Sequence, residues 1–161
     1  MNAVTEADAA LLRRAFSLAL AAKQRGNHPF GAVIASSSGD ILVEAENTVA
    51  TSGSVTAHAE LNAVSRASVA CSPETLVRST IYCSTEPCSI CASAIRWAGI
   101  GRIVFGLSQS RFRNMDNKGQ PKEPNDFTCR EMFDRTAHAV EIVGPLLEDE
   151  AQAVHAAFWR T

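Results

Sequence analysis

His58-Ala59-Glu60 and Pro87-Cys88-Ser89-Ile90-Cys91 are the two stretches from which the rest of this sequence can be interpreted. Cysteines three positions apart lie on one face of a helix, so Cys88 and Cys91 can point at a single ion. The start of a helix also stabilises thiolates, which are the form that binds metal. Catalytic zinc sites use three protein ligands and keep a fourth position for water. We therefore expect His58, Cys88 and Cys91 to bind one Zn²⁺ per chain.

Glu60 follows His58 by two positions, which places the two side chains on nearly opposite faces of a helix. Both can reach one ion only from the first turn of that helix. We infer that Glu60 approaches the zinc-bound water rather than the metal. Zinc lowers the pKa of such a water to about 7, which makes hydroxide available at neutral pH. Glu60 is therefore the predicted catalytic residue.

The pattern H-x-E … P-C-x-x-C resembles that of the cytidine-deaminase-like superfamily of zinc-dependent deaminases. Within it, the chain is similar to the branch of guanine deaminases and tRNA adenosine deaminases. The resemblance begins near residue 10 and is strongest at residues 58–60 and 85–95. It implies hydrolytic removal of an amino group from a nucleobase or nucleoside, with release of ammonia. It also implies that Glu60 carries protons from the water to the ring and the departing amine, and that the protein is a homodimer.

Two other readings of the C-x-x-C pair are a structural zinc clip and a redox pair. A structural clip needs a second pair of ligands, but Cys71, Cys83 and Cys129 are scattered singly and are expected to be small buried hydrophobes. A redox pair has no use for the H-x-E motif upstream. A non-catalytic structural zinc domain would also leave Glu60 without a role, so an enzyme is favoured.

The order of helical and strand patterns predicts an α/β protein, built as a three-layer α/β/α sandwich around a mixed five-stranded sheet. We expect residues 1–161 to form a single zinc-dependent deaminase domain. Thr56 is the expected cap of the helix at 58–70, and Asp126 that of the helix at 127–134. The expected helices are 5–25, 58–70, 88–98, 127–134 and 146–159; the expected strands are 30–35, 41–45, 80–84, 102–106 and 140–143; residues 108–125 are expected to form a long surface loop.

Five residues are expected around the substrate, all through the resemblance: Asn47, Phe30, Ala57, Trp97 and Asp116. Asn47 matches an asparagine that hydrogen-bonds the base, although it could instead brace a turn. Phe30 matches the guanine-deaminase form of its segment, where the tRNA enzymes tend to be aliphatic, although it could be a core aromatic. Trp97 could stack on the base or serve a core or interface role.

The acidic residue that guanine deaminases place against the guanine edge has no clean counterpart here. Asp116 or Asp126, in the long loop, would have to replace it. The Phe158-Trp159 pair near the end of the chain is expected to close a pocket, of its own or a neighbouring subunit, or to pack within a helix. Glu86, before Pro87, is expected to be structural.

The charge balance favours a small-molecule substrate over a nucleic acid. The formal net charge is −2 and the isoelectric point is about 6.1, whereas proteins that grip nucleic acid usually present a basic surface. We therefore expect turnover of a free purine base or nucleoside, most like guanine deaminase. Action on the wobble adenosine of tRNA is the alternative. The sequence has no apolar run of 18 residues and no basic leader at its start, so a cytoplasmic location is expected.

Overall fold

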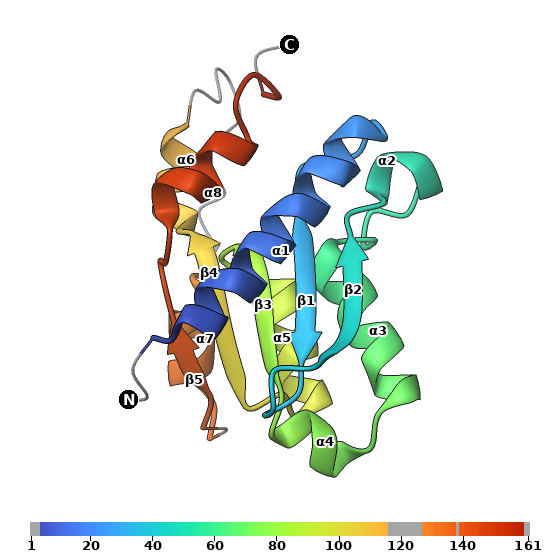
Figure 1. The fold of residues 1–161 in the computed structure, drawn as a ribbon, viewed down its shortest axis with the longest axis vertical. Coiled ribbons are helices and arrows are strands. Elements are labelled where there is room, and N and C mark those ends of the chain that lie inside the picture. The colour runs from blue at the N-terminus through green and yellow to red at the C-terminus, as the bar shows by residue number, and fades with distance from the viewer. Residues whose placement is uncertain (1–3, 116–126, 138, 160–161) are drawn as a thin grey trace.

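A computed structural model describes residues 4–115, 127–137 and 139–159 of the chain. Five strands form one sheet in the order β2-β1-β3-β4-β5 (Figure 1). Strand β1 pairs antiparallel with β2 and β3, while β3, β4 and β5 run parallel. The predicted mixed five-stranded sheet is therefore confirmed. The strands are β1 (Gly31–Ala35), β2 (Ile41–Glu46), β3 (Thr80–Thr85), β4 (Arg102–Leu107) and β5 (Glu141–Val143).

Helices cover both faces of this sheet, which confirms the three-layer sandwich. Helices α1 and α8 lie on one face, and α3, α5 and α7 lie on the other (Figure 1). Two apolar cores result, and the fully buried strand β1 contributes side chains to both. Ala32 and Ile34 belong to the core under α3 and α5, while Val33 and Ala35 belong to the core under α1 and α8. The helices are α1 (Glu6–Gln24), α2 (Val49–Ser52), α3 (Ala59–Ala70), α4 (Pro73–Val77), α5 (Ser89–Ala98), α6 (Gln109–Asn114), α7 (Cys129–Asp134) and α8 (Glu148–Val154).

Helix α1 packs so closely on the start of β1 that a side chain would not fit between them. A Cβ atom on Gly31 would lie 2.3 Å from the backbone oxygen of Ala15. The Gly31 amide also donates a hydrogen bond to Ser84 Oγ on β3, at 3.1 Å. These contacts fix the backbone at the point where the chain passes from Phe30 into the sheet.

The differences from the expected elements lie at helix ends and in the long loop. Helix α3 is capped by His58 rather than Thr56, because His58 has the extended backbone of a capping residue. Residues 109–114 of the expected loop form α6, whose first turn is capped by the Ser108 hydroxyl. Helix α7 is capped by Thr128, and Asp126 lies outside the described residues.

The last helix is shorter than expected. Helix α8 ends at Val154, with His155 as its C-terminal cap, and residues 155–159 form turns instead of continuing the helix. No helix in the described part of the chain has both the length and the apolar character needed to cross a bilayer.

Candidate metal centre and active site

Three side chains meet where helices α3 and α5 begin. The Nδ1 atom of His58 lies 3.7 Å from Cys88 Sγ and 3.5 Å from Cys91 Sγ, and the two sulfurs are 3.5 Å apart. Zinc–sulfur and zinc–nitrogen bonds of about 2.3 and 2.0 Å give a ligand tetrahedron with edges of roughly 3.5–3.8 Å. The triangle formed by this metal trio, His58, Cys88 and Cys91, therefore has the dimensions of one face of a zinc site.

Two helix starts hold the metal trio in place. His58 is the N-terminal cap of α3 and Cys88 is the cap of α5, while Cys91 is the third residue of α5. The hydrogen bond from Cys91 and then the contact with His58 lower the pKa of the Cys88 thiol to about 4, against the opposing effect of burial. The neighbouring Cys88 sulfur and burial raise the pKa of Cys91. Both thiols must be deprotonated when one metal ion binds both sulfurs.

Glu60 lies beside the metal trio from the first turn of α3. Its side chain is buried, and Oε2 is 3.6 Å from Cys91 Sγ. Burial raises the pKa of the Glu60 carboxyl to about 7. A carboxyl group with a pKa near neutrality can both accept and donate a proton at working pH, which is the property required of a general acid–base group.

A cavity of about 180 Å³ opens onto the metal trio and Glu60. Its apolar walls are Phe30 and Phe112, whose ring centroids are 5.7 Å apart at an interplanar angle of 70°. Its polar lining comes from the ends of β3 and β4 and the starts of the helices that follow. The lining residues are Phe30, His58, Glu60, Thr85, Glu86, Cys88, Cys91, Gln109 and Phe112.

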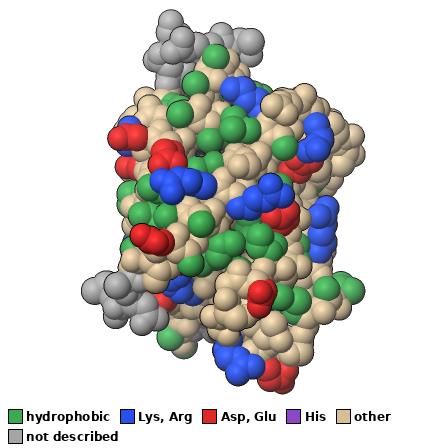
Figure 2. Space-filling view, viewed as in Figure 1, with side chains coloured by type: hydrophobic (Ala, Val, Ile, Leu, Met, Phe, Trp, Pro, Cys, Tyr) green, Lys and Arg blue, Asp and Glu red, His purple; other side chains and the backbone are tan. Residues whose placement is uncertain are grey.

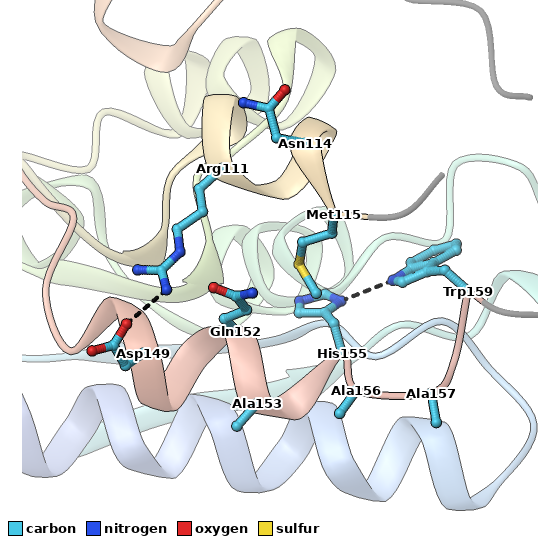
Figure 3. Close-up of a pocket in the computed structure, with 10 residues that line it drawn as sticks. All are labelled: Arg111, Asn114, Met115, Asp149, Gln152, Ala153, His155, Ala156, Ala157 and Trp159. Carbon is cyan, nitrogen blue, oxygen red and sulfur yellow. Dashed lines mark hydrogen bonds and ion pairs between the residues drawn. The ribbon is translucent and has the colours of Figure 1, made fainter. Parts of the chain in front are cut away.

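Phe158 and Trp159, near the end of the chain, form an aromatic wall behind this cavity. Trp159 packs against Phe112 with ring centroids 5.6 Å apart, and donates a hydrogen bond from Nε1 to His155 Nδ1 at 3.3 Å. Figure 3 shows this hydrogen bond, with His155 at the end of α8 and Trp159 beyond it. The Phe158 ring also packs edge-on against Trp159. Neither Phe158 nor Trp159 lines the cavity itself, so a closing role for the pair stays a prediction.

A larger, open cavity of about 660 Å³ lies between α6 and α8, on the far side of the aromatic wall (Figure 3). Its lining includes an ion pair between Arg111 and Asp149, but none of the metal trio and not Glu60. Because the reactive side chains gather at the smaller cavity, that cavity is the candidate active site.

Of the residues expected around the substrate, some line the cavity and others do not. Phe30 lines the cavity, but Asn47 and Ala57 do not. Asn47 is buried and braces a turn, because its Oδ1 accepts the Val49 amide and its backbone N–H donates to the Phe30 carbonyl. Ala57 is also buried, and its carbonyl accepts the Thr48 amide just before His58.

Trp97 does not line the cavity of its own chain. Its side chain is 82% exposed on the outer face of α5, with the Arg96 guanidinium 5.3 Å from its ring centroid. The buried face of α5 carries Cys91, Ala92 and Ile95, and Trp97 points away from it. Asp116 lies outside the described residues.

Sequence reasoning missed Thr85, Gln109, Phe112 and His155 as parts of the site. Thr85 could have been found, because it ends a strand directly before the cysteine motif. Gln109 and Phe112 lay in a segment interpreted as loop. The signal available there was Ser108, a residue type that commonly caps helices.

Comparison with known proteins agrees with this geometry. A family model described as the cytidine and deoxycytidylate deaminase zinc-binding region matches residues 5–107. A probable cytosine deaminase of Schizosaccharomyces pombe is 37% identical over 97% of this chain and 94% of its own length. Guanine deaminase of Bacillus subtilis is 42% identical over 62% of this chain and 64% of its own length. A structure from a study of tRNA:A34 deaminases is 28% identical, covers 91% of this chain and 99% of its own, and superposes with a TM-score of 0.70.

Proposed function

The chain belongs to the cytidine and deoxycytidylate deaminase family of zinc-dependent hydrolases, and we propose that it removes the exocyclic amino group of a free nucleobase. The size of the cavity carries this proposal. At about 180 Å³ it is smaller than the roughly 300–1,000 Å³ of most ligand pockets. Two aromatic rings line it together with the metal trio and Glu60, which suits one flat heterocycle.

The roles of the residues follow from their positions. We assign His58, Cys88 and Cys91 as ligands of one zinc ion, which when bound supplies Lewis-acid activation of water. Glu60 takes a proton from the attacking water and delivers protons to the ring nitrogen and the departing amine. Water thus replaces the amino group at the ring carbon, and ammonia leaves. Phe30 and Phe112 form the apolar wall against which the ring packs.

Cytosine is the first base to test and guanine the second. The Schizosaccharomyces pombe relative aligns with 97% of the chain, so its alignment extends into the residues after 107 that supply α6 and the aromatic wall. The Bacillus subtilis guanine deaminase aligns with 62% of the chain. The guanine preference expected from Phe30 therefore stays a prediction.

The surface gives less support to a tRNA substrate. On the face shown in Figure 2, Lys and Arg side chains lie among Asp and Glu instead of forming one basic area. Several arginines of the described residues are paired with acids, including Arg13 with Glu150 and Arg14 with Glu44. Nucleic-acid binding relies on basic side chains that are available to phosphates.

We also propose a homodimer in which the outer face of α5 meets a second copy. Ile90 and Trp97 expose 52% and 82% of their surface on this helix. Large exposed apolar side chains on one helix are a common mark of a protein interface. This would give Trp97 the interface role left open by the sequence.

Ammonia release from cytosine, guanine, adenine, cytidine and guanosine, alongside inosine formation in purified tRNA, tests the proposed function. We expect one free base to be turned over and tRNA to remain unmodified. Inosine in the tRNA with every free base inert would replace the proposal by the tRNA alternative.

A further inference from the structure

Glu86 joins two helices at the rim of the cavity. Its side chain is buried, and each carboxylate oxygen accepts a backbone hydrogen bond from a distant segment. Oε2 accepts the Gln109 amide at 2.9 Å, and Oε1 accepts the Cys129 amide at 3.1 Å. The Glu86 backbone is itself held, because its amide donates to the Leu107 carbonyl at 2.8 Å.

Both donors occupy the same kind of position. Gln109 is the first residue of α6 and Cys129 is the first residue of α7. Amides in the first turn of a helix have no partner inside the helix, and a negative charge there is favourable. The hydroxyls of Ser108 and Thr128 satisfy other amides of these two turns. Glu86 therefore contributes to the capping of two helices with one carboxylate.

The Glu86 carboxylate connects the segment that carries the cysteine ligands to helices α6 and α7. Glu86 precedes the zinc-ligand position Cys88 by two residues, so it moves with the metal trio. Helix α6 carries Gln109 and Phe112 into the opposite wall of the cavity. Helix α7 packs in the core below α5, whereas Phe112 packs against the core below α1 and α8.

We propose that Glu86 is a positioning residue that sets the distance between the metal trio and the α6 wall, and thereby selects which base is bound productively. This inference rests on the proposed deaminase function for its substrate but not for its geometry. Both Glu86 oxygens already accept backbone amides, whereas Glu60 lies beside the metal trio. Proton transfer is accordingly assigned to Glu60 and positioning to Glu86.

Glu86→Gln is the decisive variant, because it keeps the size of the side chain but replaces one acceptor oxygen by an NH2 group. That NH2 would face an amide N–H, so one helix start must lose its partner. We expect the Gln109 or the Cys129 amide to exchange its hydrogen at least tenfold faster. We also expect KM for the best base to rise at least tenfold with a smaller change in kcat, and the preference over the next base to narrow. Zinc content should stay at one per chain.

Glu131→Gln is the matched control. Glu131 accepts the Thr128 amide in the capping box of α7, but it is exposed and does not line the cavity. This variant should lower the melting temperature while leaving KM and base preference unchanged. If Glu86→Gln changes KM and preference no more than Glu131→Gln does, Glu86 is only structural and the inference is wrong.

Two further outcomes can be told apart: failure of the proposed function, and failure of the Glu86→Gln variant to fold. If the wild-type protein turns over no base, the proposed function fails, yet the hydrogen-exchange comparison still decides whether Glu86 holds both helices. If Glu86→Gln does not fold with zinc, Gln109→Pro removes the α6 donor at the first helical position, where proline is tolerated. An unchanged KM in Gln109→Pro would then overturn the inference.

Discussion

Thr85 Oγ1 lies 3.2 Å from Nε2 of His155, which ties the end of β3 to the end of α8. The His155 ring is almost completely buried, and its centroid lies 5.3 Å from that of Phe30 and 5.2 Å from that of Phe112. A single histidine thus fastens the aromatic wall to the strand that leads into the cysteine motif.

The first prediction concerns acid stability. Burial, followed by the charge of Lys23, lowers the pKa of His155 to about 4 from its ordinary value of 6.5. As pH falls, His155 therefore takes up a proton near pH 6.5 in the unfolded chain but only near pH 4 in the folded chain. The stability from neutral His155 is therefore fully present above pH 6.5 and is lost as pH falls through that window, by at most roughly 3 kcal/mol.

Urea unfolding of the wild type and His155→Gln at several pH values between 7 and 4 measures this loss. The variant should be less stable at pH 7 but should lose less stability on acidification. Asp8 titrates outside this range. Burial raises the pKa of its carboxyl, but hydrogen bonds from Arg102, Thr5 and Tyr82 outweigh burial and lower the pKa to about 2. The stability that ionised Asp8 contributes is therefore lost mainly below pH 4. Parallel pH profiles for the two proteins would contradict the assignment.

Much of the sheet and the metal trio could be predicted because their signals are local. Each strand is a short apolar run, and the ligands occupy helix starts at fixed spacings. Helix α6 could not be predicted in this way, since Phe112 alone gives no apolar period and its capping partners Glu86 and Glu148 come from elsewhere in the chain. The outward position of Trp97 follows from the helical period, which places it opposite Ile95.

The second prediction is that protein purified without added metal contains one zinc ion per chain. Removing both cysteines in Cys88→Ala, Cys91→Ala should abolish zinc binding, because His58 alone cannot hold the ion. Elemental analysis of both proteins provides the measurement. Full zinc retention in the double variant would exclude the metal trio as the site.

The third prediction concerns proton transfer by Glu60. Glu60→Gln should keep the fold and the zinc but lower kcat at least a hundredfold, within the roughly 10²–10⁴ range of general acid–base groups. Steady-state kinetics on the best base, with zinc content measured in parallel, tests this. Near-normal turnover with zinc bound would remove Glu60 from the mechanism.

The fourth prediction concerns assembly. Sedimentation should show a homodimer, and Trp97→Glu should shift it toward monomer, because a charge would be buried in the interface. Val69→Glu is the matched control, since Val69 is 89% exposed on α3 rather than α5. A wild-type monomer, or a dimer unaffected by Trp97→Glu, would count against an interface on α5.

The separation of the two helical layers has a consequence for how substrate choice can diverge. The side chains assigned to metal and proton chemistry come from α3 and α5, behind the sheet, while Phe112 and the aromatic wall come from α6 and the end of α8, on its other side. Mutations accumulating in the second layer can reshape recognition without disturbing the reactive centre. A lineage with this architecture can therefore move between heterocycles by substitutions in one layer, and directed evolution of this chain should target α6 and residues 156–159 first.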